Sequence, residues 1–397
     1  MTDFARTRAF FELPADVIYL DGNSLGPLPK SATQAVARTM QNDWGQQLIR
    51  AWNSAGWVDK PRLLGERIAR LIGAPAGSVV LGDTLSIKVF QALSAALALR
   101  PDRKVILSDN GNFPTDLYMA QGLVGLLDKG LELRIVDPEA VEGAIGEEVA
   151  AVLLTEVDYR TGRLHDMAAI TEKAHRAGAL TIWDLAHSAG ALPVDLAGAK
   201  ADFAVGCTYK YLNGGPGAPA FIHVSPEHAD RAEPSLAGWF GHDAPFEFET
   251  RYRPAPGIER MRVGTPPILG MIALEAALDV WDEVDLADVR RKSIELSQLF
   301  IAEVEKGCPE LTLASPRDPA LRGSQVSFRF EHGYAAMQAL IAHGVIGDFR
   351  APDIMRFGFT PLYLREEDVR GAARILERIM RERLWDDARY QDRSAVT

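Results

Sequence analysis

The sequence has few features of secreted, membrane or nucleic-acid-binding proteins. It contains only two cysteines, Cys207 and Cys308, too few for a disulfide scaffold or a thiolate metal cluster. No apolar run approaches the roughly 20 residues that span a bilayer, and residues 1–4 lack the basic and apolar regions of a signal peptide. Acidic residues outnumber basic ones, 54 against 43, with no local basic patch to attract a phosphate backbone. These absences predict a soluble cytoplasmic protein with no nucleic-acid or membrane partner.

Metal chemistry is also not indicated. The histidines at positions 223, 242 and 343 lack the spacing of metal ligands and have no carboxylate partner nearby in the sequence. We therefore expect no bound metal.

Short apolar runs alternate with helical segments from about residue 31 onward. Most of the runs are β-branched and continuously apolar, as expected for strands that are covered on both faces. They lie at residues 79–81, 105–107, 133–136, 152–154, 180–183, 203–205 and 221–224. Helical segments such as 167–177 separate several of them, which predicts an α/β fold with a mostly parallel sheet. In such sheets, ligands bind at the carboxyl ends of the strands.

Beyond about residue 270 the pattern changes to a long helix, a strand and a second helix. Residues 282–306 are charged and helical, residues 325–330 alternate like a half-buried strand, and residues 366–384 form an amphipathic helix. This order is typical of a smaller α+β domain. The chain is therefore predicted to comprise an N-terminal arm near the active site (1–30), a large domain (31–275) and a small C-terminal domain (276–397).

Two of the predicted strands end in residues that are suited to catalysis. Asp184 ends one strand, and His187 follows three residues later; alone, such an aspartate is more often a helix cap. The next strand leads to Lys210, which lies between Tyr209 and Tyr211 and precedes a glycine-rich loop. A lysine that forms a Schiff base and an aspartate that keeps a pyridinium nitrogen protonated are the minimal machinery of pyridoxal 5'-phosphate (PLP) catalysis.

A phosphate site is available upstream of these residues. The segment 79–86 runs from a strand into the helix 87–99, where free amides and the Ser86 hydroxyl would form an anion-binding cup. Asp83 or Ser86 acting as an ordinary helix N-cap explains the segment equally well. Phe113, in a later loop, could stack on a cofactor ring, although a loop phenylalanine is more often part of the core.

Several longer motifs resemble the kynureninase family, which consists of PLP enzymes of the fold-type-I, aspartate aminotransferase-like group. The resemblance covers nearly the whole chain. Its most specific motifs are GNSLG in the N-terminal arm, YKYLN around the lysine and GWFGH further on. The matching segments are 20–27, 113–116, 184–187, 209–213, 238–242 and 266–268.

The resemblance implies a fold-type-I large domain, PLP as the cofactor, and hydrolysis of the Cβ–Cγ bond of L-kynurenine, or of its 3-hydroxy derivative, to give L-alanine. Lys210 would bind the cofactor covalently, Asp184 would pair with its ring nitrogen, and Phe113 would stack on its ring. Tyr209 would deliver a proton to Cβ. The rest of the cofactor site would comprise Leu85, Ser86, Thr115, Asp116, Thr155, His187 and Tyr209.

The resemblance also implies a homodimer with shared active sites. Trp239 and Thr265 would reach the phosphate in the neighbouring subunit; many family members carry Asn where Thr265 stands, so the reach is shorter here. Arg356 would bind the α-carboxylate of the substrate, with Asn23 and Ser24 beside it. Independently of the family, an arginine in an apolar run is costly to bury unless it is paired, which favours an anionic ligand at Arg356.

Two other readings compete with this one. Another fold-type-I enzyme, such as a cysteine desulfurase or an aminotransferase, would share the lysine and the aspartate, but neither cysteine is placed like a reactive loop thiol. A catalytically inactive binding protein on the same fold would not need Asp184, Lys210 and Arg356 together.

Overall fold

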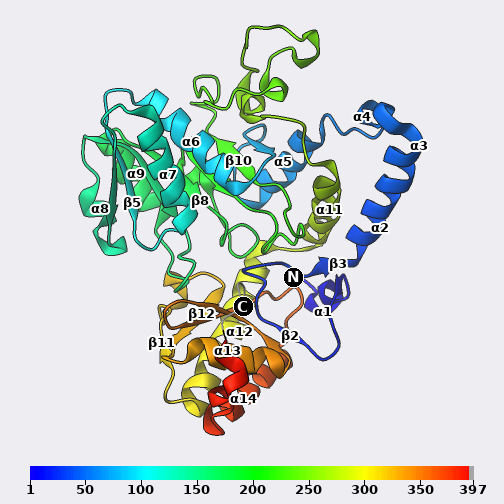
Figure 1. Cartoon of the computed structure of the whole chain (residues 1–397), viewed down its shortest axis with the longest axis vertical. Helices are drawn as coiled ribbons and strands as arrows, with labels where there is room; N and C mark the ends of the chain where they lie inside the picture. The colour runs from blue at the N-terminus through cyan, green and yellow to red at the C-terminus, as the bar shows by residue number, and fades with distance from the viewer. Residues whose placement is uncertain (393–397) are drawn as a thin grey trace.

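The computed structural model describes residues 1–392 and contains two main sheets, which form the upper and lower bodies in Figure 1. The larger sheet has seven strands in the order β4-β10-β9-β8-β7-β5-β6. Strands β6, β5, β7, β8 and β9 pair in parallel, while β10 runs antiparallel to both β9 and β4. The prediction of a mostly parallel α/β sheet is therefore confirmed. The strands are β4 (Val79–Leu81), β5 (Val105–Asp109), β6 (Glu132–Val136), β7 (Val149–Thr155), β8 (Leu180–Asp184), β9 (Phe203–Gly206) and β10 (Phe221–Val224).

Burial explains why these runs are so apolar. Every residue of the central strand β7 is buried, whereas the edge strand β6 is partly exposed and carries charged side chains. In the parallel register Thr155, the last residue of β7, lies opposite Asp184, the last residue of β8. The carboxyl ends of the central strands therefore meet at one edge of the sheet, as the fold class requires.

Helices cover both faces of this sheet, and local signals set their ends. Proline at the first position starts α7, and the Asp166 side chain caps α9 by accepting the Ala169 N–H at 3.0 Å. Gly178, in the left-handed region at a φ of 80°, ends α9. The Asp195 side chain caps α10 by accepting the Gly198 N–H. These helices are α5 (Lys60–Leu71), α6 (Leu85–Leu99), α7 (Pro114–Leu127), α8 (Val141–Ala144), α9 (Met167–Ala177), α10 (Leu196–Ala199) and α11 (Ile268–Leu278).

The second sheet has four strands in the order β11-β12-β15-β14, and three helices pack on it. The long helix begins at residue 286 rather than 282, because a 3-10 turn occupies 279–283 and Asp285 caps the helix. The last helix has its predicted buried face but ends at 381 rather than 384. These elements are β11 (Thr312–Leu313), β12 (Gln325–Arg329), β14 (Asp348–Arg350), β15 (Ile354–Gly358), α12 (Leu286–Gly307), α13 (Gly333–Ala342) and α14 (Glu366–Arg381).

The N-terminal residues are tied to both bodies. Strand β2 (Ile18–Tyr19) pairs in parallel with β13 (Val345–Ile346), and β1 (Phe11–Glu12) pairs with β3 (Leu28–Pro29). The loop after β2 reaches the lysine segment, where the Gly26 N–H donates to the Tyr209 carbonyl at 2.8 Å. The domain limits 1–30, 31–275 and 276–397 stay a prediction. The remaining N-terminal helices are α1 (Phe4–Arg8), α2 (Lys30–Arg38), α3 (Gly45–Gln47) and α4 (Ala51–Ser54).

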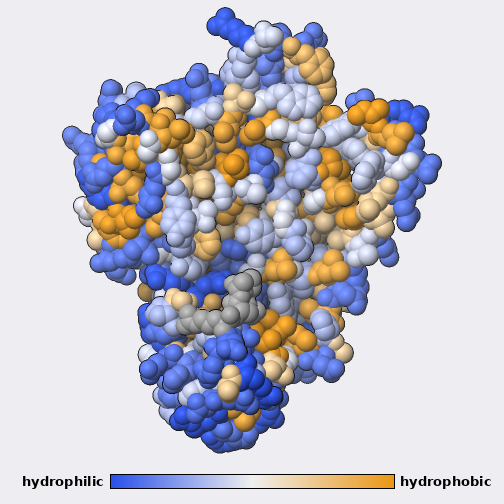
Figure 2. Space-filling model, in the orientation of Figure 1, coloured by the Kyte–Doolittle hydropathy of each residue, from blue (hydrophilic) through white to orange (hydrophobic). Residues whose placement is uncertain are grey.

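The rod formed by α2, α3 and α4 projects from the body in Figure 1, and Figure 2 shows apolar surface at its tip. Three large apolar side chains there are exposed: Trp44 by 55%, Leu48 by 61% and Ile49 by 77%. Among residues 1–392, no helix combines the length and the apolarity that crossing a bilayer requires.

Candidate active site

The amine of Lys210 lies among aromatic and imidazole side chains near the carboxyl edge of the large sheet. Its Nζ is 3.0 Å from His187 Nε2 and 5.9 Å from the centre of the Phe113 ring. Lys210 follows β9 and His187 follows β8, so the two side chains come from neighbouring strands. Phe113 is 39% exposed and meets Tyr159 edge to face, with the ring centres 5.2 Å apart. The structure therefore brings these sequence-predicted residues together.

The imidazole of His187 stays neutral beside Lys210. Burial lowers the pKa of its imidazole well below the usual value, and the charges of Lys210, Arg356 and Arg350 lower it further. A neutral ring nitrogen can accept a hydrogen bond from an N–H of Lys210, which explains the short contact between the two groups.

Two carboxyl groups lie buried beside the lysine. Asp184 is 1% exposed, and its Oδ1 accepts the Ala186 N–H at 2.8 Å. Asp116, in the first turn of α7, is equally buried. Burial and then the charge of Asp184 raise the pKa of Asp116 well above the usual range, so Asp116 holds a proton. Burial raises the pKa of Asp184 as well, while the charge of Lys210 opposes the rise.

This arrangement fits the ring nitrogen of PLP. Asp184 and Asp116 cannot both ionise cheaply in a dry pocket, but one carboxylate is stabilised when a cationic N–H faces it. A side-chain hydrogen bond between Asp116 and Asp184 also contributes to the raised pKa of Asp116, as expected for two carboxyl groups that share one proton.

Asn112 is a site residue that we did not single out from the sequence. Its Oδ1 accepts bonds from the Thr155 hydroxyl at 2.6 Å and from the Phe113 N–H at 2.7 Å. Its amide group donates to the Ser108 Oγ at 3.0 Å. Asn112 therefore joins the end of β7 to the loop that carries Phe113. Its position directly before the FPTD motif is a signal, but asparagine is so common in loops that the signal is weak.

The N-terminus of α6 is open for an anion. Leu85 and Ser86 stand in its first turn, and the N-cap residue Thr84 makes no side-chain capping bond. Asp83 is not a cap either, because it takes a left-handed conformation and its Oδ2 lies 3.3 Å from the buried Nζ of Lys88. The alternative that Asp83 or Ser86 is the N-cap is therefore wrong, and the free amides remain available to a phosphate.

Trp239 and Thr265 are both exposed, and Trp239 is 41% exposed. The Trp239 ring packs on that of Phe240, with the ring centres 4.1 Å apart, and stacks on Phe248 at 6.4 Å. Thr115, also predicted for the cofactor site, is half-buried in the first turn of α7.

Arg356 is buried in β15 and is already paired. Its cross-strand neighbour in β14 is Asp348, whose Oδ1 accepts the Arg356 Nε–H at 2.8 Å and whose Oδ2 accepts from Nη2. Because Asp348 offsets the cost of burial, burial alone no longer favours an anionic ligand at Arg356, and its binding of the substrate carboxylate stays a prediction. Ser24 joins the pair: its hydroxyl donates to Asp348 Oδ2 at 2.7 Å and accepts from Arg356 Nη2 at 2.8 Å. Asn23 is fully buried nearby, with its Oδ1 against Gly358.

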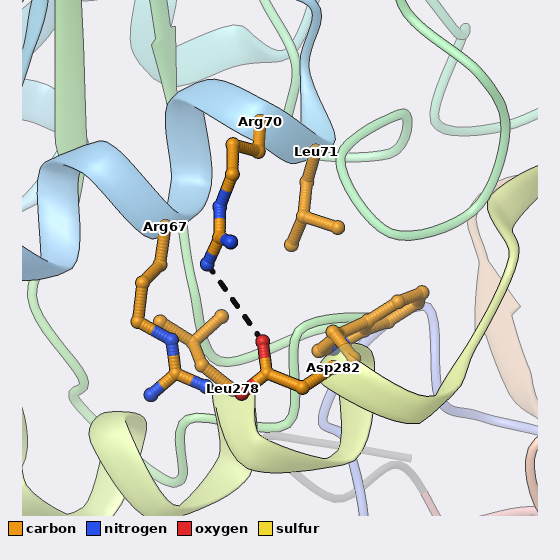
Figure 3. Close-up of a pocket in the computed structure, with 6 residues that line it drawn as sticks. Arg67, Arg70, Leu71, Leu278 and Asp282 are labelled. Carbon is orange, nitrogen blue, oxygen red and sulfur yellow. Dashed lines mark hydrogen bonds and ion pairs between the residues drawn. The ribbon is translucent and has the colours of Figure 1, made fainter. Parts of the chain in front are cut away.

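A separate pocket of about 210 Å³ contains none of the predicted site residues. Figure 3 shows Arg67 and Arg70 of α5 pointing toward Asp282. Asp282 pairs with both arginines, at 2.8 Å and 3.7 Å, and Asp279 pairs with Arg67 at 2.9 Å, so two carboxylates offset the two positive charges. Among the described residues, no group of three or more His, Cys, Asp and Glu side chains is placed to hold a metal ion.

The chain is similar to known proteins over nearly its whole length. A sequence profile of the kynureninase C-terminal domain matches residues 289–376. The kynureninase of Pseudomonas fluorescens is 52% identical over 99% of this chain and 96% of its own length.

Solved structures of PLP enzymes show the same fold at low identity. A cysteine desulfurase from Thermococcus onnurineus NA1 superposes with a TM-score of 0.80 at 20% identity, covering 95% of this chain and 98% of its own. A C-DES mutant with glycine linked to its PLP cofactor gives 0.78 at 18%, covering 93% and 98%. At these identities the likeness shows the fold alone, which confirms the fold-type-I prediction. The identity to the Pseudomonas enzyme over nearly the full length shows more, and the chain belongs to the kynureninase family.

Proposed function

We propose that this protein binds PLP through Lys210 and hydrolyses L-kynurenine to anthranilate and L-alanine. The observation that carries the proposal is the placement of the Lys210 amine beside neutral His187 at the sheet edge where Asp184 is buried. Family membership at 52% identity supports kynurenine as the substrate.

The residues around the lysine would hold the cofactor. The open N-terminus of α6, with Leu85 and Ser86, would bind its phosphate, and Phe113 would cover its ring. Asp184 would face the ring nitrogen and keep it protonated. When bound, PLP supplies an electron sink for the bonds at Cα and Cβ of the substrate.

Lys210 and Tyr209 would move the protons. We assign the removal of the Cα proton to the Lys210 amine, after the substrate amine has displaced it from the cofactor. Neutral His187, 3.0 Å away, would accept an N–H of that amine and leave its lone pair free for the proton. We assign proton delivery to Cβ to Tyr209. The adjacent Cys207 and then burial raise the pKa of the Tyr209 phenol, so it keeps its proton near neutral pH and can give it up only to a stronger base such as a carbanion.

The two cysteines do not support a desulfurase. Such an enzyme needs an accessible, easily ionised thiol. Cys207 is 3% exposed, and Cys308 is fully buried. Burial raises the pKa of both thiols, that of Cys308 to about 12.

We also propose that the protein is a homodimer whose active sites are shared. The exposed rings of Trp239 and Phe248 and the apolar tip of the α2–α4 rod are surfaces that a second copy would cover. Mixing inactive Lys210→Ala and Trp239→Ala chains tests this. Mixed dimers should regain activity at the site that carries neither change, and heterodimers that stay inactive would contradict sharing.

Product analysis tests the reaction itself. The PLP-loaded protein should convert L-kynurenine into equal amounts of anthranilate, followed by its fluorescence, and L-alanine, followed by chromatography. Transamination products in place of anthranilate would contradict the proposed reaction. Parallel assays with 3-hydroxykynurenine would show which of the two substrates the protein prefers.

A further inference from the structure

Arg356 alone has too few free N–H donors to bind a carboxylate through two hydrogen bonds. A guanidinium has five N–H groups. Four of them are used: Nε–H and one Nη2–H on Asp348, the other Nη2–H on Ser24, and one Nη1–H on the Tyr159 carbonyl at 2.5 Å. One Nη1–H is left for a ligand. A carboxylate has two oxygens that both need donors when it leaves water, so a second donor must come from elsewhere.

Arg350 is placed to supply that donor. It is the last residue of β14, two positions after Asp348, and therefore on the same face of the strand. Its Nη2 lies 2.7 Å from Asp348 Oδ2, so the two arginines share one carboxylate. The Arg350 side chain is 34% exposed, against 2% for Arg356. Among the described residues, Arg350 Nε is buried without a hydrogen-bond partner, and its Nη1 makes one long contact, 3.5 Å to the Phe349 carbonyl, so Nη1 is the group with N–H donors to offer a ligand.

The charges of this cluster leave room for one anion. Two guanidiniums face the single carboxylate of Asp348 and the nearby carboxyl of Asp21. Burial and then the charge of Asp348 raise the pKa of Asp21 to about 7, so below that pH Asp21 is mostly neutral and the cluster has one positive charge in excess. Both arginines also lower the pKa of His187, which touches the Lys210 amine, so their field reaches the reaction centre.

We propose that Arg350 is a second substrate-binding residue, which together with the free N–H of Arg356 holds the two oxygens of the substrate α-carboxylate, while Asp348 positions both guanidiniums. The proposal rests on one part of the proposed function, namely that the substrate is an α-amino acid that binds at Lys210. The ligand class is any α-amino acid with a free carboxylate, which includes the product L-alanine.

Ligand binding tests the proposal without turnover. L-alanine and L-alaninamide, which lacks the carboxylate, are titrated into the PLP-loaded protein while the cofactor absorbance is followed. Wild type should bind L-alanine more tightly than the amide. Arg350→Gln should weaken L-alanine binding about 10–100-fold, the loss of a charge-assisted bond, and leave the amide within about 2-fold.

Two further variants make the result specific. Arg350→Lys keeps a positive charge beside Asp348 and should lose less, about 3–10-fold, which keeps the test valid if Arg350→Gln does not fold. Arg70→Lys is the matched control, because Arg70 also shares a carboxylate with a second arginine (Figure 3) but lies outside the site. It should bind both ligands like wild type.

Some results would contradict the proposal that Arg350 and Arg356 together bind the α-carboxylate, an arrangement that we call the clamp. Equal losses for L-alanine and L-alaninamide in the Arg350 variants would show a general structural role. Unchanged L-alanine binding in both variants would show that Arg350 does not touch the ligand. A wild type that prefers L-alanine to the amide yet makes no anthranilate from L-kynurenine would leave the clamp standing and refute the substrate assignment instead.

Discussion

Replacing Asp348 with asparagine tests how the carboxylate-binding cluster is held together. The Asp348 carboxylate accepts two bonds from Arg356 and one from Ser24, and it pairs with Arg350. Asparagine keeps the size but removes the charge. Because removing one partner of a buried ion pair costs about 3–5 kcal/mol, and the amide oxygen can still accept one bond, we expect the free energy of unfolding to fall by about 3 kcal/mol.

The kinetic effect of Asp348→Asn should appear in kcat and not in KM. Without the competing carboxylate, both guanidiniums still attract the substrate anion, so KM should not rise. The guanidiniums lose the partner that fixes their orientation, however, and a misplacement of about 1 Å can cost about 100-fold in rate. We therefore expect kcat to fall about 10–100-fold.

Steady-state kinetics and urea unfolding of the PLP-loaded protein measure both effects. Asp353→Asn is the control, since Asp353 pairs with the half-exposed Arg329 and should contribute less than about 1 kcal/mol. If Asp348→Asn were as stable as this control, or raised KM with kcat unchanged, Asp348 would not be a positioning residue.

Three other variants test separate parts of the site. Asp184→Asn should lower kcat about 100–1000-fold with the fold intact by circular dichroism, since the ring nitrogen loses its anion; full activity would refute the pairing. Arg356→Lys should lower kcat/KM about 10–1000-fold and also the melting temperature, because the bonds to Asp348 and Tyr159 are lost, while the cofactor absorbance stays unchanged. An unchanged melting temperature would contradict the observed pairing. Burial raises the pKa of Glu156 to about 7, so the folded state holds a proton that the unfolded state releases above about pH 4.5, and stability falls as pH rises toward 7. Glu156→Gln should remove that fall, so that its free energy of unfolding gains about 3 kcal/mol over that of wild type between pH 4.5 and 8. If the free energies of unfolding of the two proteins changed in parallel with pH, Glu156 would not be buried as a neutral acid.

Much of the fold could be predicted because its signals are local. Seven apolar runs became the seven strands of the large sheet, and the apolar stripe of 366–384 became the buried face of α14. The residues at which helices begin and end could be predicted less closely than the helices themselves. The long helix starts four residues later than its charge pattern indicates, because Asp285 is the residue whose side chain caps it.

The pairing of Arg356 could not be predicted, because it depends on the register between two strands. Asp348 and Arg356 are eight residues apart, and only the antiparallel pairing of β14 with β15 sets them side by side. Arg350 reaches the same carboxylate from two positions along β14, but the shared use of Asp348 by two arginines again depends on the pairing with β15. Lys88 likewise depends on a distant partner: it is fully buried in α6, where its Nζ donates to Asp83 at 3.3 Å and to the distant Met261 carbonyl at 2.9 Å.

Locating the cofactor on the chain tests the central claim most directly. PLP-loaded protein is reduced with borohydride, which fixes the cofactor to the amine that holds it, and the peptides are identified by mass spectrometry; Lys210→Ala is treated and assayed in parallel. We predict that the cofactor is found on Lys210, and that Lys210→Ala neither retains it nor forms anthranilate from L-kynurenine. Cofactor fixed to another lysine, such as Lys88, or anthranilate formation by Lys210→Ala at the wild-type rate, would contradict the account.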